Sequence, residues 1–236
     1  MLKYGCEEIY IKDGKSFEVK QIYIDISKII SSCFDKTEDI AVLDVGCASG
    51  ELLFFLKQNL GLQTKPVGFD YNKHLIYNAI SRFGIDDFEF LIGDVADFKS
   101  SGKFDVIVLT GVLACFDDFH FPLNNVVRHL KEGGLLLVFG RFNEFDIDVR
   151  IEFKVGDNGV WSGGYNLFRL PEVVRFIEKL GLNVVCKDFV LPFDLEKGLN
   201  PVKSWTVDLD GVQWQMNGLH LVHIPKFLIC RKTLKS

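Results

Sequence analysis

Carboxylates and glycines are spaced along residues 44–111 in a way that suits the binding of a nucleotide-like ligand. The first group is Asp44-Val45-Gly46-Cys47-Ala48-Ser49-Gly50, which follows a short apolar run and precedes a helical pattern starting at Glu51. Because glycine lacks a Cβ, the backbone at Gly46 and Gly50 can take unusual dihedral angles and let a ligand come close. A strand that turns through glycine into a helix presents its backbone to nucleotides in doubly wound sheets. The same pattern also suits a turn that binds nothing.

Three further groups follow at the ends of later apolar runs. Asp70 lies 20 residues after Gly50, where a carboxylate can accept hydrogen bonds from both hydroxyls of a ribose. Asp94 follows Leu91-Ile92-Gly93, and Thr110-Gly111 follows the run that starts at Phe104. Two alternatives stay open, because Asp70 could instead cap the helix that begins near Lys73 and Asp94 could be an ordinary turn residue.

The glycine spacing separates two classes of ligand. The dinucleotide fingerprint G-x-G-x-x-G requires a glycine five residues after the first, but Glu51 stands five residues after Gly46. The pattern D-x-G-x-G-x-G instead matches Asp44, Gly46, Ala48 and Gly50, with alanine in the middle glycine position. In this order and spacing the chain resembles the class I S-adenosylmethionine (SAM) dependent methyltransferases.

The resemblance has motif-level support over residues 38–142 and rests on element pattern alone over 171–232. It implies SAM as cofactor, with Asp70 on the ribose, Tyr71 against the adenine and Asp94 accepting the adenine amino group. The residues that it assigns to the cofactor are Asp44, Gly46, Cys47, Ala48, Gly50, Asp70, Tyr71, Asp94, Val95, Thr110 and Gly111.

From residue 40 onward, strand-like apolar runs alternate with helical patterns, which predicts an α/β fold with a parallel sheet covered on both faces. The resemblance implies a Rossmann-like, doubly wound sheet of seven strands, mostly parallel with an antiparallel last strand. The expected strands are Ala41–Val45, Pro66–Asp70, Phe88–Gly93, Phe104–Thr110, Gly134–Gly140, Asn183–Val190 and His220–Cys230. The expected helices are Gln21–Phe34, Glu51–Leu60, Asn72–Phe83, Pro122–Leu130 and Pro171–Leu180. Pro225 interrupts the last run, which favours a bulge or an edge position for that strand.

We expect a single domain over residues 1–236. Residues 1–36 form an N-terminal helical cap, either packed on the sheet or acting as a lid. Residues 143–168 and 193–219 are aromatic-rich insertions expected to lie over the acceptor site, because ligands bind outside the carboxyl ends of the strands. Their aromatic and amide groups suit a sugar or another polar small molecule, and equally an ordinary packed loop. The candidate acceptor residues are Trp161, Tyr165, Asn166, Trp205, Trp214 and Asn217.

Methyl transfer needs a general base only if the acceptor is a hydroxyl or a protonated amine. Histidine is the usual choice at neutral pH. His220 is the candidate, since it stands close to the second insertion, whereas strand alternation puts His223 on the opposite face.

Bulk properties exclude several partners. The net charge is −5 and there is no Lys/Arg run, which argues against a nucleic acid substrate. No apolar run approaches the length of a membrane span. Six scattered cysteines without a C-x-x-C pair predict no metal site, reduced thiols and a cytoplasmic location. The oligomeric state is left undetermined.

The sequence therefore predicts a SAM-dependent methyltransferase that acts on a small molecule, with a sugar or a cell-surface precursor as the class considered. The first alternative is a non-catalytic module that binds SAM or S-adenosylhomocysteine (SAH). The second is an NAD-type oxidoreductase, which the glycine spacing disfavours.

Overall fold

The computed structural model describes the chain from residue 17 to residue 234, except for residues 38, 96, 99–101, 158 and 201. The first sixteen residues of the expected N-terminal cap, including Cys6, lie outside the described residues.

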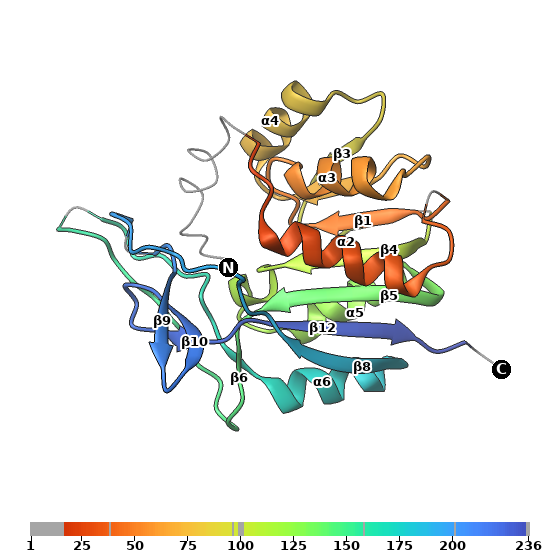
Figure 1. Ribbon diagram of the computed structural model, residues 1–236. Helices are drawn as coiled ribbons and strands as arrows, with labels where there is room; N and C mark the ends of the chain where they lie inside the picture. Colours follow the sequence, from red (N-terminus) through yellow and green to blue (C-terminus); the bar gives the residue numbers. More distant parts are fainter. Residues whose placement is uncertain are drawn as a thin grey trace.

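A seven-stranded sheet in the order β3-β2-β1-β4-β5-β12-β8 forms the centre of the molecule (Figure 1). Strands β1 to β5 are parallel, and β12 is antiparallel to both of its neighbours, β5 and β8. The predicted fold class is thereby confirmed. The strands are β1 (Val42–Val45), β2 (Val67–Asp70), β3 (Glu89–Ile92), β4 (Phe104–Thr110), β5 (Leu130–Gly140), β8 (Leu182–Asp188) and β12 (Lys226–Lys232).

The last strand differs from its prediction in two ways. It begins at Lys226 rather than His220, because Pro225 has no N–H to give to the sheet and lies just outside it. The carbonyl of Pro225 still accepts a hydrogen bond of 2.8 Å from Phe189 N–H. An edge position is wrong, since β12 is paired on both sides.

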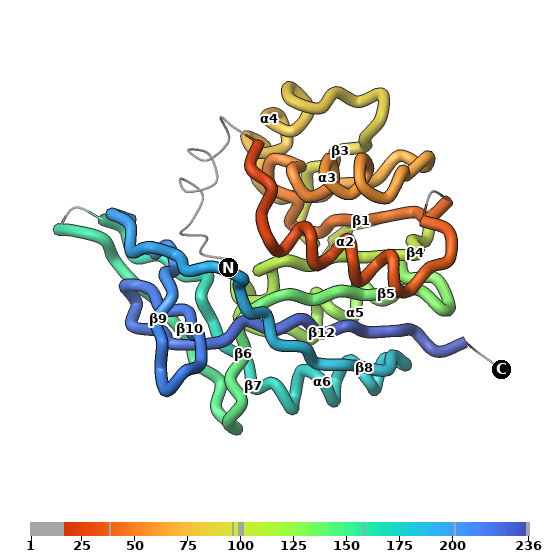
Figure 2. Tube along the Cα trace, in the orientation of Figure 1, coloured from red at the N-terminus to blue at the C-terminus, as the bar shows by residue number. Residues whose placement is uncertain are grey.

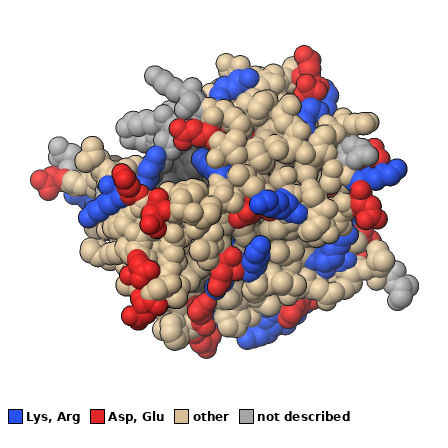
Figure 3. All heavy atoms as spheres, viewed as in Figure 1, with Lys and Arg blue, Asp and Glu red and all other residues tan. Residues whose placement is uncertain are grey.

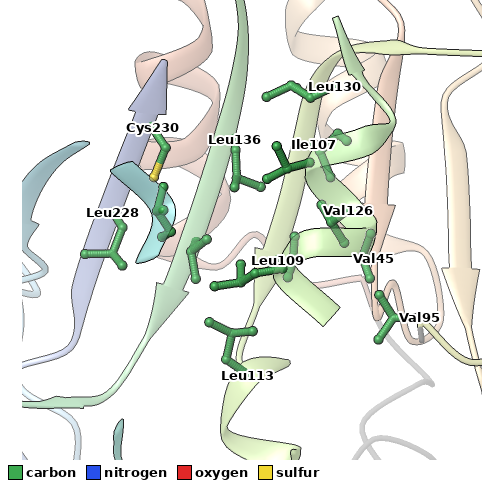
Figure 4. Close-up of a cluster of buried hydrophobic side chains, with 14 of the residues drawn as sticks. Val45, Val95, Ile107, Leu109, Leu113, Val126, Leu130, Leu136, Leu228 and Cys230 are labelled. Carbon is green, nitrogen blue, oxygen red and sulfur yellow. The ribbon is translucent and has the colours of Figure 1, made fainter. Parts of the chain in front are cut away.

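Helices cover both faces of the sheet, and strand alternation sorts the core between them. On one face lie α2 (Gln21–Cys33), α3 (Glu51–Leu60) and α4 (Lys73–Phe83), packed on side chains such as Val106 and Leu137. On the other face lie α5 (His120–Arg128) and α6 (Leu170–Lys179), packed on the cluster in Figure 4, where Ile107, Leu136 and Leu228 lie together. Burying each such side chain stabilises the folded state by about 1.5–3 kcal/mol.

The helix predicted over Gln21–Phe34 is α2, and its stripe packs on the sheet. Tyr23, Ile26, Ile29 and Ile30 are buried in the same cluster as α3. This helix therefore belongs to the core of the domain.

The two insertions lie at the end of the sheet toward which the arrows of β1 and β5 point in Figure 1, and Figure 2 shows the same arrangement. In the first, β6 (Phe142–Asn143) pairs with β7 (Phe168–Arg169). In the second, β9 (Trp205–Leu209) and β10 (Val212–Met216) form a hairpin, and β11 (Val222–His223), which follows the insertion, adds a third strand. The hairpin turns at Asp210-Gly211, where both φ angles are positive, at 55° and 78°. Both insertions thus have their own secondary structure.

Acidic and basic side chains are intermixed on the face shown in Figure 3. In the first insertion, Oδ1 of Asp146 lies 2.9 Å from Nη1 of Arg169, and Oδ2 of Asp148 lies 3.2 Å from its Nε. Both carboxylates are therefore ion-paired with Arg169. Within the described ranges, no helix is long and apolar enough to cross a membrane.

Candidate functional site

A cavity of about 390 Å³ lies at the carboxyl ends of β1, β2, β3, β4 and β5. Its size falls in the range of small-molecule sites, about 300–1,000 Å³. All the predicted cofactor residues except Gly50 line it, namely Asp44, Gly46, Cys47, Ala48, Asp70, Tyr71, Asp94, Val95, Thr110 and Gly111. The structure thus brings together residues spread over nearly seventy positions of the chain.

The glycine turn is fixed against the second strand. The N–H groups of Gly46 and Cys47 both donate to the carbonyl of Phe69, at 2.7 and 3.1 Å. Gly46 has φ +76°, and a Cβ there would stand 2.5 Å from Cγ2 of Val112. Ala48 also has a positive φ, of 48°, so the middle position of the turn takes a conformation that glycine adopts more easily.

Gly50 has a structural role. It lies at φ +79° immediately before α3, and a Cβ there would stand 2.8 Å from the Phe90 ring. Ser49 does not cap this helix, since α3 has no side-chain cap. Gly50 therefore lets the start of α3 pack closely on β3 and α4.

Asp70 ties the turn to the end of β2. Its Oδ2 accepts the N–H of Ala48 at 3.0 Å, and its Oδ1 accepts the N–H of Asn72 at 2.8 Å. The cap of α4 is Asn72, whose Oδ1 accepts from His74 N–H at 2.9 Å, so the capping alternative for Asp70 is wrong. Asp70 also lines the cavity.

Asp44, the penultimate residue of β1, is 1% exposed, and its Oδ1 has no hydrogen-bond partner within the described part of the chain. Burial, with the charge of Asp70 second, raises the pKa of Asp44 from 3.8 to about 8. Burial also raises the pKa of the neighbouring Cys47 thiol well above its ordinary value, and Asp44 adds to this effect. At neutral pH both groups are mainly protonated.

The third and fourth strands complete the wall. The Asp94-Val95 loop is held by Asn125, whose Nδ2 donates to the carbonyl of Val95 at 2.7 Å. Gly111 has φ +71° and its N–H donates to the carbonyl of Phe139 at 2.8 Å, and a Cβ there would meet only open space. The carboxyl end of β4 therefore faces the cavity with its backbone.

Only Tyr165 of the candidate acceptor residues lines the cavity. Asn166 is buried and builds the loop, because its Nδ2 donates to the carbonyl of Phe116 at 2.8 Å and its Oδ1 accepts from Ile151 N–H at 3.1 Å. Trp161 is 59% exposed. These two residues lie outside the cavity wall.

In the second insertion the lining residues are Ser204 and Gln215. Trp214 precedes Gln215 in β10, and successive side chains of a strand point to opposite faces, so Trp214 faces away. Trp205 contacts Lys197, whose Nζ is 5.0 Å from its ring centroid. Asn217 holds a turn, since its Oδ1 accepts from Leu219 N–H at 3.0 Å.

The structure does not support a base at His220. This residue is exposed, has φ +57°, and its N–H donates to Asn217 at 2.9 Å in a turn rather than in the predicted strand. His223 is buried, and burial, followed by the charge of Arg141, lowers its pKa to about 3. Among the described residues that line the cavity there is no histidine.

Sequence reasoning missed several lining residues, chiefly Lys20 and Tyr23 at the start of α2, and Arg141 directly after β5. The guanidinium of Arg141 lies 4.8 Å from the ring centroid of Tyr165. Its position directly after the fifth strand was an available signal, because Asp70 and Thr110 are the last residues of the second and fourth strands, whose carboxyl ends lie at the same edge of the sheet. No group of three metal-binding side chains occurs in the part of the chain that is described.

Comparison with known proteins agrees with this geometry. Residues 36–152 match a family model described as a methyltransferase domain. An arsenite methyltransferase of Aquipseudomonas alcaligenes is 36% identical over 134 residues, which are 52% of this chain and 37% of that protein. The alignments with the first curated relatives cover between 37% and 53% of each relative's length.

Solved structures share the fold. One is a complex of the Haloferax volcanii Trm112 methyltransferase activator with a methyltransferase, with TM-score 0.67, 16% identity and coverage of 99% of this chain and 100% of that chain. Another is SAM-bound CalS10, an amino pentose methyltransferase from Micromonospora echinaspora, with TM-score 0.56, 15% identity and coverage of 96% of both chains. With the matched domain, the seven-stranded sheet and the motifs around its cavity, the chain belongs to the class I superfamily of SAM-dependent methyltransferases, whose cofactor is SAM.

Proposed function

We propose that this protein transfers a methyl group from SAM to a small-molecule acceptor. The observation that carries the proposal is the cavity itself, which collects the glycine turn, Asp70, Asp94 and the Thr110-Gly111 backbone at one edge of the sheet. Ligands of open α/β sheets bind at this edge.

The residues present fit SAM. Asp70 is held by two backbone N–H groups and would accept the ribose hydroxyls, with Tyr71 at the rim against the adenine and Asp94 at its amino group. The buried Oδ1 of Asp44 would gain a cationic neighbour, since SAM carries a sulfonium and an ammonium.

When bound, SAM supplies a methyl group on an excellent leaving group. The task of the chain is then to hold an acceptor lone pair in line with that methyl, and positioning of this kind contributes about 7–11 kcal/mol in favourable cases. Because no histidine of the described residues lines the cavity, we propose an acceptor that needs no histidine base.

The cavity volume of about 390 Å³ and the mixed charges on the face shown in Figure 3 support a small acceptor rather than a nucleic acid. For a sugar acceptor the remaining support is Tyr165, the one candidate acceptor residue in the cavity wall. The scattered cysteines of the sequence are the basis for proposing a cytoplasmic location.

Calorimetry with SAM, SAH and NAD tests the cofactor. We expect SAM and SAH to bind and NAD not to bind. Asp70→Ala should weaken the binding of SAM at least tenfold, because it removes hydrogen bonds to a charged group and loosens the glycine turn. Asp86→Ala, at an exposed carboxylate outside the cavity, is the control. Unchanged SAM affinity in Asp70→Ala would refute the ribose contact.

A screen of small-molecule acceptors, with SAH release as the readout, tests catalysis. Turnover would exclude the non-catalytic SAM-binding module. Tight SAM binding without SAH release on any acceptor would favour that alternative.

A further inference from the structure

The cavity extends beyond the strands that would hold SAM. In the sheet order, β2 and β3 lie on one side of β1, whereas β4 and β5 lie on the other. Asp70 and Asp94 therefore mark one half of the cavity, and Arg141, after β5, marks the opposite half together with Tyr165 and Gln215. If SAM occupies the first half, its acceptor occupies the second.

Arg141 is held on a rigid support. It directly follows β5, which is paired with β4 up to Phe139 and with β12 up to Gly140. Its guanidinium stacks on Tyr165, 4.8 Å from the ring centroid, and Tyr165 is itself buried. The loop after Tyr165 is fixed by the N–H of Asn166, which donates to the carbonyl of Ala114 at 3.0 Å. A guanidinium carries its N–H donors in one plane as a fork, which can bind a carboxylate in a bidentate way.

The surroundings of Arg141 strengthen its attraction for a negatively charged group. Val112, Phe116 and Phe139 give this part of the wall apolar surface, where charges are screened less than in water. The charge of Arg141 also contributes to lowering the pKa of the buried His223. The opposite half already holds Asp70 and Asp94, which disfavours an acceptor of high negative charge.

We propose that the methyl acceptor is a small molecule carrying a single carboxylate, which pairs with Arg141 while the body of the molecule lies against Tyr165. This proposal rests on the proposed function, because it assumes that SAM fills the half of the cavity around Asp70. Arg141 is a residue of acceptor specificity, and the carboxylate is the group that anchors the acceptor.

The test uses matched pairs of probes on the full chain saturated with SAH. The pairs are benzoate and benzamide, phenylacetate and phenylacetamide, and propionate and propionamide, with phenyl phosphate as the phosphate arm. Binding is measured by calorimetry and thermal shift. We expect at least one carboxylate to bind at least tenfold more tightly than its amide, and Arg141→Gln to abolish that preference, as a lost charged hydrogen-bond pair implies.

Two further variants make the test specific. Arg150→Gln is the matched control, because this arginine is 69% exposed and lies outside the cavity. It should keep the full preference for the carboxylate. Arg141→Lys keeps the charge but loses the bidentate geometry, and should bind the carboxylate several-fold more weakly than the wild type. If Arg141→Gln does not fold, Arg141→Lys carries the comparison.

The outcomes are distinguishable. Wild-type protein that does not bind SAH refutes the proposed function. Wild-type protein that binds SAH but treats every carboxylate and amide alike, or prefers phenyl phosphate, overturns the carboxylate proposal alone. A folded Arg141→Gln variant that loses SAH affinity also overturns it, because Arg141 would then serve the cofactor.

Discussion

Replacing Asp44 with asparagine should stabilise the free protein while weakening its cofactor site. Asp44 is buried at the end of β1, and its pKa is raised from 3.8 to about 8 by burial and by Asp70. Because the folded state holds the proton and the unfolded state releases it, folding at neutral pH requires proton uptake. The contribution of this group is fully present below pH 3.8 and is lost as the pH rises toward 8.

The magnitude follows from the pKa values. At pH 7 the solution lies about three units above the unfolded pKa of 3.8, and each unit corresponds to about 1.4 kcal/mol. The buried carboxyl therefore costs about 4 kcal/mol at pH 7. Asparagine has nearly the same shape and does not titrate, so Asp44→Asn should raise the free energy of unfolding by up to this amount. The gain should shrink toward zero near pH 4.

Urea denaturation of the wild type and Asp44→Asn between pH 4 and pH 8 measures this gain, with Asp86→Asn as an exposed control. Calorimetry in buffers of different ionisation enthalpy measures the effect of the substitution on SAM binding and on the accompanying proton release. A cationic ligand favours the charged carboxylate, so SAM binding to the wild type at pH 7 should release about one proton, and Asp44→Asn should bind SAM more weakly without proton release. A variant no more stable than the wild type at pH 7, or a difference that does not vary with pH, would refute the reasoning.

Three further predictions concern the glycine turn and the buried His223. Gly50→Ala should destabilise the protein by at least about 2 kcal/mol, because its φ is +79° and its Cβ would contact Phe90, and a lowered Tm checks this. Ala48→Gly should raise stability by about 1 kcal/mol in urea denaturation, since Ala48 has φ +48°; a loss would contradict the proposed strain. His223→Leu should make the protein less sensitive to acid, because the pKa of His223 falls from 6.5 to about 3 on folding. The free energy of unfolding of the wild type should therefore fall by about 2 kcal/mol between pH 7 and pH 5, and that of the variant should not show this loss. Equal losses in the two proteins would show that His223 does not titrate in this way.

The cofactor half of the cavity could be predicted because it follows the order of the strands. Each parallel strand ends at the same edge of the sheet, so Asp44, Asp70, Asp94 and Thr110 meet there once the strands are recognised. The local hydrogen bonds around these residues were harder to predict from the sequence. Asn72, rather than Asp70, caps α4, and only the backbone path after β2 decides between them.

The acceptor half could not be predicted from residue type. Trp214 and Gln215 are adjacent in β10, and the register of the β9–β10 hairpin decides which of them faces the cavity. The Asp210-Gly211 pair is a hairpin signal that would have set this register. His220 was selected on the assumption of a strand through Pro225, which the turn after Asn217 replaces.

The place of β12 has a consequence for biosynthesis. Strands β5 and β8 are made earlier, yet neither is hydrogen-bonded to the other, and residues 226–232 fill the space between them. Until those residues leave the ribosome, β5 and β8 each have an unpaired edge next to the positions that Phe227 and Leu228 later bury. Unpaired strand edges can pair with other chains and cause aggregation. Folding of the sheet is therefore completed only once residues 226–232 have been made, and a nascent chain stalled before residue 226 should depend on chaperones to stay unaggregated.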